Sequence, residues 1–245
     1  MWKWWCLLLL FPELVLCAEP LRAVVSQTNT APYAIFDQQQ RLTDGIAKEL
    51  LDTLAARLSR PVQYLDLPRG RVVEWLVTDQ ADISCFLNPA WVPANYKLSW
   101  TPVLFHTRQY IVRRSGDSPV LSNQDLFRKR IGTTRGFAYP ELQPLFETNS
   151  AVRDDAESLE KNIQRLEQGR VDLVMTVDLS YGYYQQHFDT SKLSVDPLWA
   201  EPAAVYCALN PKHPLLVQQI QDQLKLMQQQ GVINKTLQRF EHSSN

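Results

Sequence analysis

The sequence has little glycine and almost no excess of charge of either sign. Its 245 residues include only 8 glycines beside 15 prolines, which excludes collagen-like and low-complexity chains. The 25 lysines and arginines are balanced by 26 aspartates and glutamates, which excludes a strong electrostatic binder of nucleic acid. The hydrophobic fraction of 45% is instead typical of a globular protein, and the length allows one large domain or two small ones.

The usual signatures of catalysis are missing as well. The four histidines, at positions 106, 187, 213 and 242, are isolated and lack the spacing of a metal site. No serine lies in a Gly-x-Ser-x-Gly elbow, and no glycine-rich phosphate loop follows a strand-like segment. We therefore expect a protein that is not an enzyme and that needs neither a metal nor a cofactor.

The one long apolar segment lies at the N-terminus. An apolar run at 4–11 follows Lys3 and resumes at 14–18. The run is shorter than the roughly 20 residues of a membrane-spanning helix, but it fits the apolar core of about 7–15 residues in a secretory signal peptide. We predict a signal peptide over residues 1–18, cleavage after Ala18 and a soluble mature protein.

Lipid attachment at Cys17 is an alternative interpretation of the same segment. Leu16, which precedes it, is bulkier than the small residue that lipoprotein signals have there, so we do not expect an anchor. Cleavage after Ala18 removes Cys17 and Cys6 together. Only Cys85 and Cys207 then remain in an oxidising compartment.

Hydrophobic periodicity predicts strands and helices in alternation. Strands are expected at 21–26, 62–67, 81–86, 109–113, 129–133, 171–176 and 205–209. Helices are expected at 46–58, with Thr43 or Asp44 as its cap, and at 71–77, 157–167, 214–230 and 233–240. This order argues for parallel sheets flanked by helices.

One segment is echoed 90 residues later. Leu76 to Asp82 has the same layout as Leu166 to Asp172, namely a helix end, a tight turn, an aspartate and a strand-like run. Helix-turn-strand units are common, so chance is one explanation of the match. Together with the order of the elements, the echo indicates two similar α/β lobes in one chain.

Short motifs occur in a characteristic order over nearly all of the chain after residue 18. They are Ala31-Pro32-Tyr33, Leu42 to Ile46, Asp82 to Phe86, Trp100-Thr101-Pro102, Tyr110 to Arg114, Ser122 to Leu126, Arg130 to Gly136, Gly169 to Asp172, Ala203 to Asn210 and Gln229 to Val232. No single motif is specific, but their order and spacing resemble the periplasmic solute-binding proteins of the amino-acid type (family 3).

The resemblance implies a two-lobed α/β fold of the type II periplasmic-binding class, with a mainly parallel sheet flanked by helices in each lobe. Lobe I would comprise residues 19–103 and 200–245, and lobe II residues 104–199. A ligand would bind in the crevice between them, outside the carboxyl ends of the strands.

The same resemblance implies a periplasmic monomer that captures a small molecule and delivers it to an inner-membrane permease of an ABC transporter. One alternative is a regulatory protein that reports the ligand to a membrane sensor. A periplasmic dehydratase on the same fold is a third interpretation, with Asp178 as the candidate acid. None of these functions involves nucleic acid.

The residues that bind an α-amino acid in this family are changed here. The arginine that binds the carboxylate falls near Ala94, and the aspartate that binds the ammonium falls at Val177, one residue before Asp178. Thr30 replaces an aromatic residue that often stacks on the ligand. We therefore expect a small polar or aromatic-containing solute, amino-acid-like or related, that is bound by other residues than those of a standard α-amino-acid site.

The candidate ligand-binding residues share a predicted position at the crevice. They are Tyr33, Arg71, Asn88, Trp91, Arg135, Gly136, Phe137, Tyr139, Asp178 and Tyr181. Arg71 is favoured over Arg69 as an anion-binding group, and the loop 135–139 is expected to offer backbone N–H groups at a helix start. The alternatives are a solvated surface residue for Arg71, an interface plug for Trp91 and a helix cap for Asp178.

The family topology also makes neighbours of the strands that carry Cys85 and Cys207. A disulfide between them would then be within reach. Two buried free thiols are the alternative, because a bridge within a sheet strains the usual geometry.

Overall fold

The computed structural model describes residues 18–241. The predicted signal peptide, apart from Ala18, lies outside the described residues, as do Cys6, Cys17 with its lipid alternative, and His242. Within residues 18–241 no helix has both the length and the hydropathy needed to cross a bilayer.

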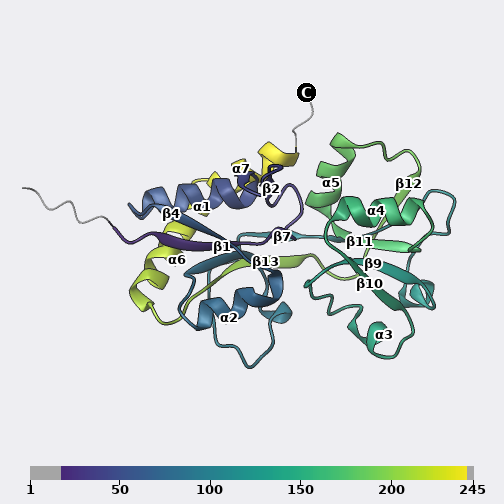
Figure 1. Ribbon diagram of the computed structural model, residues 1–245, viewed down its shortest axis with the longest axis horizontal. Coiled ribbons are helices and arrows are strands. Elements are labelled where there is room, and N and C mark those ends of the chain that lie inside the picture. Colours follow the sequence, from purple (N-terminus) through teal and green to yellow (C-terminus); the bar gives the residue numbers. More distant parts are fainter. Residues whose placement is uncertain (1–17, 242–245) are drawn as a thin grey trace, which may run out of the picture.

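A first sheet collects strands from both ends of the described chain. Its order is β4-β1-β5-β13-β6, and β7 extends it by pairing with β13. The bounds are β1 Leu21–Val25, β4 Val62–Asp66, β5 Ile83–Leu87, β6 Ser99–Trp100, β7 Phe105–Thr107 and β13 Ala203–Leu209. The helices around it are α1 Ile46–Arg57, α2 Val72–Val77, α6 Pro214–Gln229 and α7 Val232–Glu241, with a small hairpin of β2 Ile35–Phe36 and β3 Leu42–Asp44 (Figure 1).

A second sheet is built from the middle of the chain. Its order is β10-β9-β11-β8-β12. The bounds are β8 Gln109–Arg114, β9 Arg130–Thr134, β10 Val152–Ala156, β11 Leu173–Val177 and β12 Leu193–Pro197, with helices α3 Gln143–Glu147, α4 Leu159–Glu167 and α5 Asp178–His187. Figure 1 shows the two sheets side by side, each with its own helices, which confirms the predicted two-lobed α/β fold.

The sheets are mixed rather than mainly parallel. Strands β4, β1 and β5 are parallel in the first sheet, and β10, β9 and β11 are parallel in the second. Strand β13 runs antiparallel to β5, β6 and β7, and β8 runs antiparallel to β11 and β12. The antiparallel members include β8 and β13, which each follow a connection from the other sheet.

Two neighbouring segments connect the sheets. Strand β7 leads directly into β8, and the chain after β12 leads into β13. The two segments pair with each other, with Ala203 opposite Thr107 and Val205 opposite Phe105. The predicted lobe boundaries at 103/104 and 199/200 fall close to this pairing and stay a prediction.

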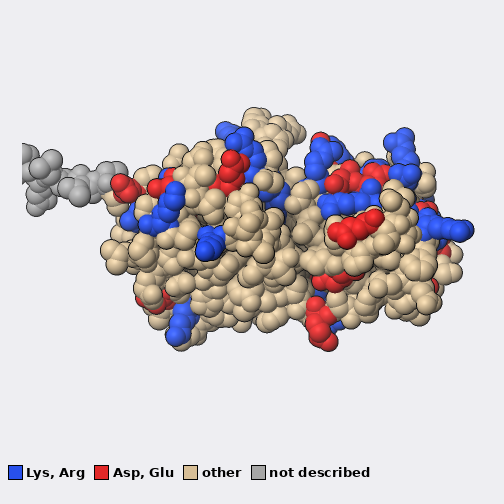
Figure 2. All heavy atoms as spheres, turned by 90° about the horizontal axis from the view of Figure 1, so that it is seen from below, with Lys and Arg blue, Asp and Glu red and all other residues tan. Residues whose placement is uncertain are grey.

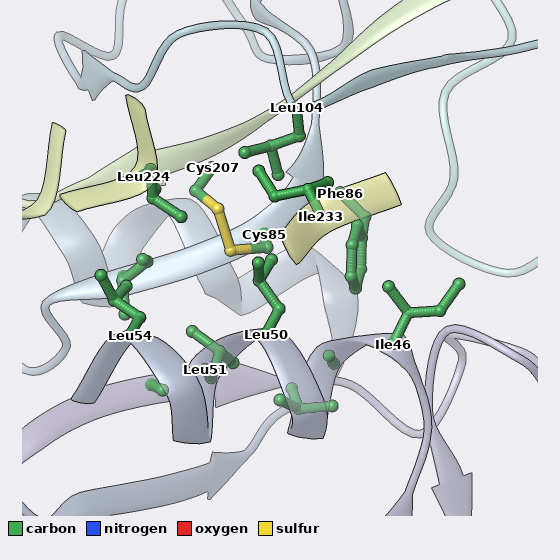
Figure 3. Close-up of a cluster of buried hydrophobic side chains, with 14 of the residues drawn as sticks. Ile46, Leu50, Leu51, Leu54, Cys85, Phe86, Leu104, Cys207, Leu224 and Ile233 are labelled. Atoms are coloured by element: carbon green, nitrogen blue, oxygen red, sulfur yellow. A yellow bond between two sulfur atoms is a disulfide. The ribbon is translucent and has the colours of Figure 1, made fainter. Parts of the chain in front are cut away.

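Helix α1 forms because apolar residues recur along one face. Its buried positions 46, 50 and 54, and 47, 51 and 55, make a stripe of two adjacent rows that packs beside α6 and α7 (Figure 3). The predicted cap at Thr43 or Asp44 is wrong, because Gly45 is the N-cap and no side chain caps the helix. Gly45 has a φ of 113°, and a Cβ there would lie 2.9 Å from the Tyr33 carbonyl oxygen, so only glycine fits.

The two similar segments, 76–82 and 166–172, make the same hydrogen bonds in their respective sheets. The Asp82 carboxylate accepts the Arg22 N–H at 2.8 Å, while the Asp82 N–H donates to the Arg22 carbonyl. Asp172 makes the same pair of bonds with Arg130, at 2.7 and 2.8 Å. Asp79 and Gly169, each three positions before its aspartate, are in the left-handed region, with φ values of 69° and 68°. The two lobes therefore use the same turn and the same aspartate hydrogen bonds to join a helix to the next parallel strand.

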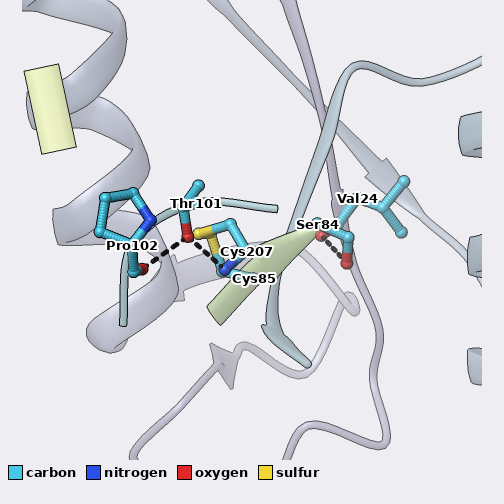
Figure 4. The surroundings of a disulfide bond; sticks show 6 residues. All are labelled: Val24, Ser84, Cys85, Thr101, Pro102 and Cys207. Carbon is cyan, nitrogen blue, oxygen red and sulfur yellow. Dashed lines mark hydrogen bonds between the residues drawn. A yellow bond between two sulfur atoms is a disulfide. The ribbon is translucent and has the colours of Figure 1, made fainter. Parts of the chain in front are cut away.

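A disulfide joins Cys85 of β5 to Cys207 of β13, across 122 residues of sequence. Both residues are buried in the core of the first sheet (Figure 3), and the Cys207 N–H donates to the Thr101 hydroxyl at 2.9 Å (Figure 4). The structure therefore has the bridge and not the pair of free thiols.

The double change Cys85→Ala/Cys207→Ala should lower the free energy of unfolding by about 2–5 kcal/mol, because the bridge constrains the unfolded chain. Urea unfolding followed by circular dichroism measures this loss. A reductant should destabilise the unmodified protein and leave the double variant unaffected. Two alkylated thiols in unreduced, denatured protein would contradict the bridge.

Candidate functional site

A cavity of about 90 Å³ lies between the two sheets. Segments that directly follow β1, β4, β5, β9 and β11 contribute to its wall, so it sits at the carboxyl ends of parallel strands. Four predicted residues line it, namely Tyr33, Trp91, Phe137 and Tyr139. Its other lining residues are Asn29, Thr30, Arg69, Phe86, Thr107, Gln109, Thr134, Ala138, Met175, Thr176, Val177, Ser180 and Val205.

Arg69 is the charged side chain of this wall. It begins a 3-10 turn, Arg69–Arg71, just after β4. Its guanidinium donates to the Asn29 side-chain oxygen and to the Phe86 carbonyl, each at 3.1 Å, and lies 4.4 Å from the centre of the Phe137 ring. Burial of this guanidinium away from water lowers the pKa of Arg69 to about 10.

A bulge in β5 shapes the wall beside Arg69. Cys85 pairs with Cys207 and Leu87 with Tyr206, so Phe86 is the extra residue between two consecutive partners. Its φ of 64° is unusual for a bulky residue and bends the strand. The bend places the Phe86 ring 4.9 Å from the Tyr33 ring, and leaves the Phe86 carbonyl free to accept from Arg69.

Several contacts join the two sides of the cavity. The hydroxyls of Thr30 and Ser180 are 3.1 Å apart, and Arg69 stacks on Phe137 of the opposite lobe. A Cβ on Gly136, whose φ is 78°, would lie 2.9 Å from the Arg69 Cβ. The lobes are therefore in a closed arrangement, in which the Gly136 backbone of one lobe lies close to the Arg69 side chain of the other.

The loop after β9 uses two of its backbone donors within the fold and does not lead directly into a helix. The Arg135 N–H donates to the Ala156 carbonyl and the Phe137 N–H to the Thr134 carbonyl. Helix α3 begins only at Gln143, so no helix start follows this loop directly. The predicted helix start is therefore absent, whereas the N–H groups of Gly136, Ala138 and Tyr139 make no backbone hydrogen bond among the described residues, so the predicted backbone contribution of this loop stays a prediction.

Tyr139 instead closes this loop through its side chain. Its hydroxyl accepts the Thr134 N–H at 2.9 Å, and burial raises its pKa. The Arg153 guanidinium lies 5.4 Å from the Tyr139 ring centre and donates to the Phe137 carbonyl at 2.9 Å. These contacts fix Phe137 against Arg69.

Asp178 is a structural residue rather than a cavity residue. Its carboxylate accepts hydrogen bonds from the Thr107 hydroxyl at 2.6 Å, the Arg108 N–H at 2.9 Å and the Leu179 N–H at 2.8 Å. These bonds tie the first residue of α5 to the segment between β7 and β8. Asp178 is therefore the first residue of α5 and not its cap, since Val177 is the N-cap and no side chain caps the helix.

Two predicted arginines lie away from the cavity. Arg71 is exposed, with its Nε 4.0 Å from Glu74, and Arg135 is exposed beside Glu157 at 3.6 Å. Both are solvated side chains. Arg69, two residues earlier, is the arginine that lines the cavity.

The last two predicted ligand-binding residues, Asn88 and Tyr181, make contacts within the protein and do not line the cavity. Asn88 donates to the Ala204 carbonyl at 2.7 Å and accepts the Ala90 N–H at 2.8 Å, which holds the turn after β5. Tyr181 is 2% exposed and packs in a core cluster with α4 and β8. Gln109 was missed, and its side-chain oxygen is buried without a partner among the described atoms.

Charges outside the cavity are mixed rather than gathered by sign. On the face drawn in Figure 2, lysines and arginines lie next to aspartates and glutamates. Arg113 pairs with Asp196 at 2.8 Å, and Arg22 with Asp82 at 2.6 Å. The near-zero net charge thus reflects local pairing.

The change Gly136→Ala should open the lobes, because the added Cβ meets Arg69 and the positive φ is strained for alanine. We expect a larger radius of gyration in small-angle X-ray scattering and weaker binding of any ligand. Gly182→Ala is the control, since a Cβ there meets open space. An unchanged radius in Gly136→Ala would show that this contact does not limit closure.

No family model and no curated protein matches the chain. Solved structures match over most of its length. An ancestral arginine-binding protein bound to arginine has a TM-score of 0.77 at 18% identity, covering 91% of this chain and 99% of the other. An arginine-specific periplasmic binding protein of Salmonella typhimurium has a TM-score of 0.74 at 13% identity, covering 91% and 99%.

The substrate-binding protein of an amino acid ABC transporter has a TM-score of 0.71 at 16% identity, covering 89% of this chain and 98% of the other. The structural neighbours are thus arginine-binding and amino-acid substrate-binding proteins, as the sequence resemblance predicts. Identities this low establish the shared two-lobed fold. They leave the ligand to be argued from the cavity.

Proposed function

We propose that the protein is a periplasmic solute-binding protein that encloses a small molecule between its lobes and delivers it to a membrane transporter. The cavity carries this proposal, because both sheets contribute the carboxyl ends of their strands to it. The signal peptide at 1–18, the lobe boundaries and the monomeric state belong to the same proposal.

The connecting strands support a cycle of opening and closing. Only β7 with β8, and the segment before β13, link the sheets along the chain, and the two lie side by side. Rotation about such a pair of strands would open the cavity, and it would also move Val177 and Leu179 away from the core of the first sheet, against which they pack. The cavity of about 90 Å³ is smaller than ordinary ligand pockets of roughly 300–1,000 Å³, so ligand entry requires this opening.

The cavity offers little to an enzymatic alternative. Of the described residues that line it, none is an aspartate, glutamate, histidine or cysteine. Asp178, the acid proposed for a dehydratase, has its carboxylate bound by three donors of the fold. Binding without turnover is therefore the function that the site supports best.

Protein purified from its own periplasm should carry a small molecule visible in native mass spectrometry. Adding that molecule back to stripped protein should raise the melting temperature and reduce the radius of gyration in small-angle X-ray scattering. At 100 times the dissociation constant, binding stabilises the folded state by about 2.7 kcal/mol. A flat melting temperature across copurified and tested solutes would refute the proposal.

A further inference from the structure

The cavity has one formal charge. Among the described residues that line it, Arg69 is the only lysine or arginine, and no aspartate or glutamate accompanies it. Arg69 is half-buried, and a cation that is partly withdrawn from water without a counter-charge is unfavourable. An anion in the cavity would remove this penalty.

The geometry of Arg69 suits a carboxylate. One face of the guanidinium lies against the Phe137 ring, and two hydrogen bonds go to Asn29 and the Phe86 carbonyl. A guanidinium has five N–H donors in a planar fork. Its other N–H donors make no hydrogen bond within the part of the chain that the structure describes, and this planar edge matches the two oxygens of a carboxylate.

The described lining of the cavity offers no carboxylate to an ammonium group, and its one buried acceptor without a partner is the neutral side-chain oxygen of Gln109. The position at which amino-acid-binding relatives are expected to have an aspartate is the half-buried Val177, which lines the cavity with an apolar side chain. The neighbouring Asp178 lies outside the lining, and its oxygens accept from Thr107, Arg108 and Leu179. An ammonium entering here would lose water and gain no carboxylate.

Aromatic and apolar side chains cover both sides of the wall, beside the neutral polar residues Asn29, Thr30, Thr107, Gln109, Thr134, Thr176 and Ser180. Tyr33, Phe86 and Trp91 line one side, and Phe137 and Met175 line the other. The Tyr33 and Phe86 rings pack together and form a continuous surface. Such a wall favours a hydrocarbon body on the ligand.

We infer that the ligand is a small organic carboxylate without an ammonium group, bound through its carboxylate to Arg69 and through its hydrocarbon body to the aromatic wall. This inference rests on the proposed solute-binding function. It separates the protein from amino-acid binding, because the carboxylate is recognised from a different position and the ammonium is not recognised at all.

The test compares compounds that have the same hydrocarbon side chain but differ in whether they carry a carboxylate, an ammonium group or both. Titration calorimetry on stripped protein would use the series of alanine, leucine and phenylalanine, each beside its 2-hydroxy acid, its unsubstituted carboxylic acid and the corresponding amine without a carboxylate. At least one acid that lacks an ammonium should bind about tenfold or more tightly than its amino acid, since a buried unpaired ammonium is penalised. The amines should not bind.

Variants of two nearby arginines assign the carboxylate contact. Arg69→Gln should weaken the best acid by about tenfold or more, and Arg69→Lys should restore part of that loss, because it returns the charge without the fork. Arg71→Gln is the matched control and should bind as the unmodified protein does, since Arg71 is exposed beside Glu74. Equal affinities of the Arg69→Gln and unmodified proteins would overturn the inference.

A gain of preference provides a second readout if Arg69→Gln folds poorly. Val177→Asp introduces a carboxylate into the cavity wall, and it should weaken the best acid while improving the matching amino acid. An amino acid or amine that binds the unmodified protein as tightly as the matching acid would overturn the ligand class. A copurified ligand of another class would do the same and leave the solute-binding function standing, whereas protein that binds nothing refutes both.

Discussion

The structure depends on the pairing of β13 with β5. Strand β13 returns from the second sheet and enters the first, antiparallel to β5, and the Cys85–Cys207 disulfide fastens the two strands together. The same strand continues into the connection, where it pairs with β7. One strand thus completes the core of the first lobe, links the lobes and, through the bulge opposite it at Phe86, shapes the cavity.

The bulge at Phe86 affects the charge of the site, because it provides an acceptor for Arg69. An unbulged strand would keep the Phe86 carbonyl in the ladder between β5 and β13. The extra residue releases that carbonyl to accept from Arg69, whose other protein acceptor is neutral Asn29. Neutral acceptors hold the guanidinium in place without cancelling its charge. A carboxylate partner supplied by the protein would have satisfied Arg69 and removed its attraction for an anion.

Sequence patterns predicted the fold better than the site, for physical reasons. Buried helices and strands reveal themselves through periodicity, whereas β10, an edge strand, reads Val-Arg-Asp-Asp-Ala and was missed because its side chains are largely solvated. The cap of α1 depended on a close backbone approach at Gly45, which no side-chain pattern encodes. Arg69 and Arg71 stand in the same short turn, and sequence cannot tell which of two such neighbours faces inward.

Similarity of fold and similarity of ligand are separable in this protein. The two-lobed architecture depends on buried apolar stripes such as that of α1 and on Asp82 and Asp172, which join helix to strand, and these residues lie outside the cavity lining. Ligand chemistry depends on a few positions at the strand ends, where one side chain changes the charge. With valine at 177 and arginine at 69, the described lining has one positive charge and no carboxylate, which differs from the balance expected for a zwitterion.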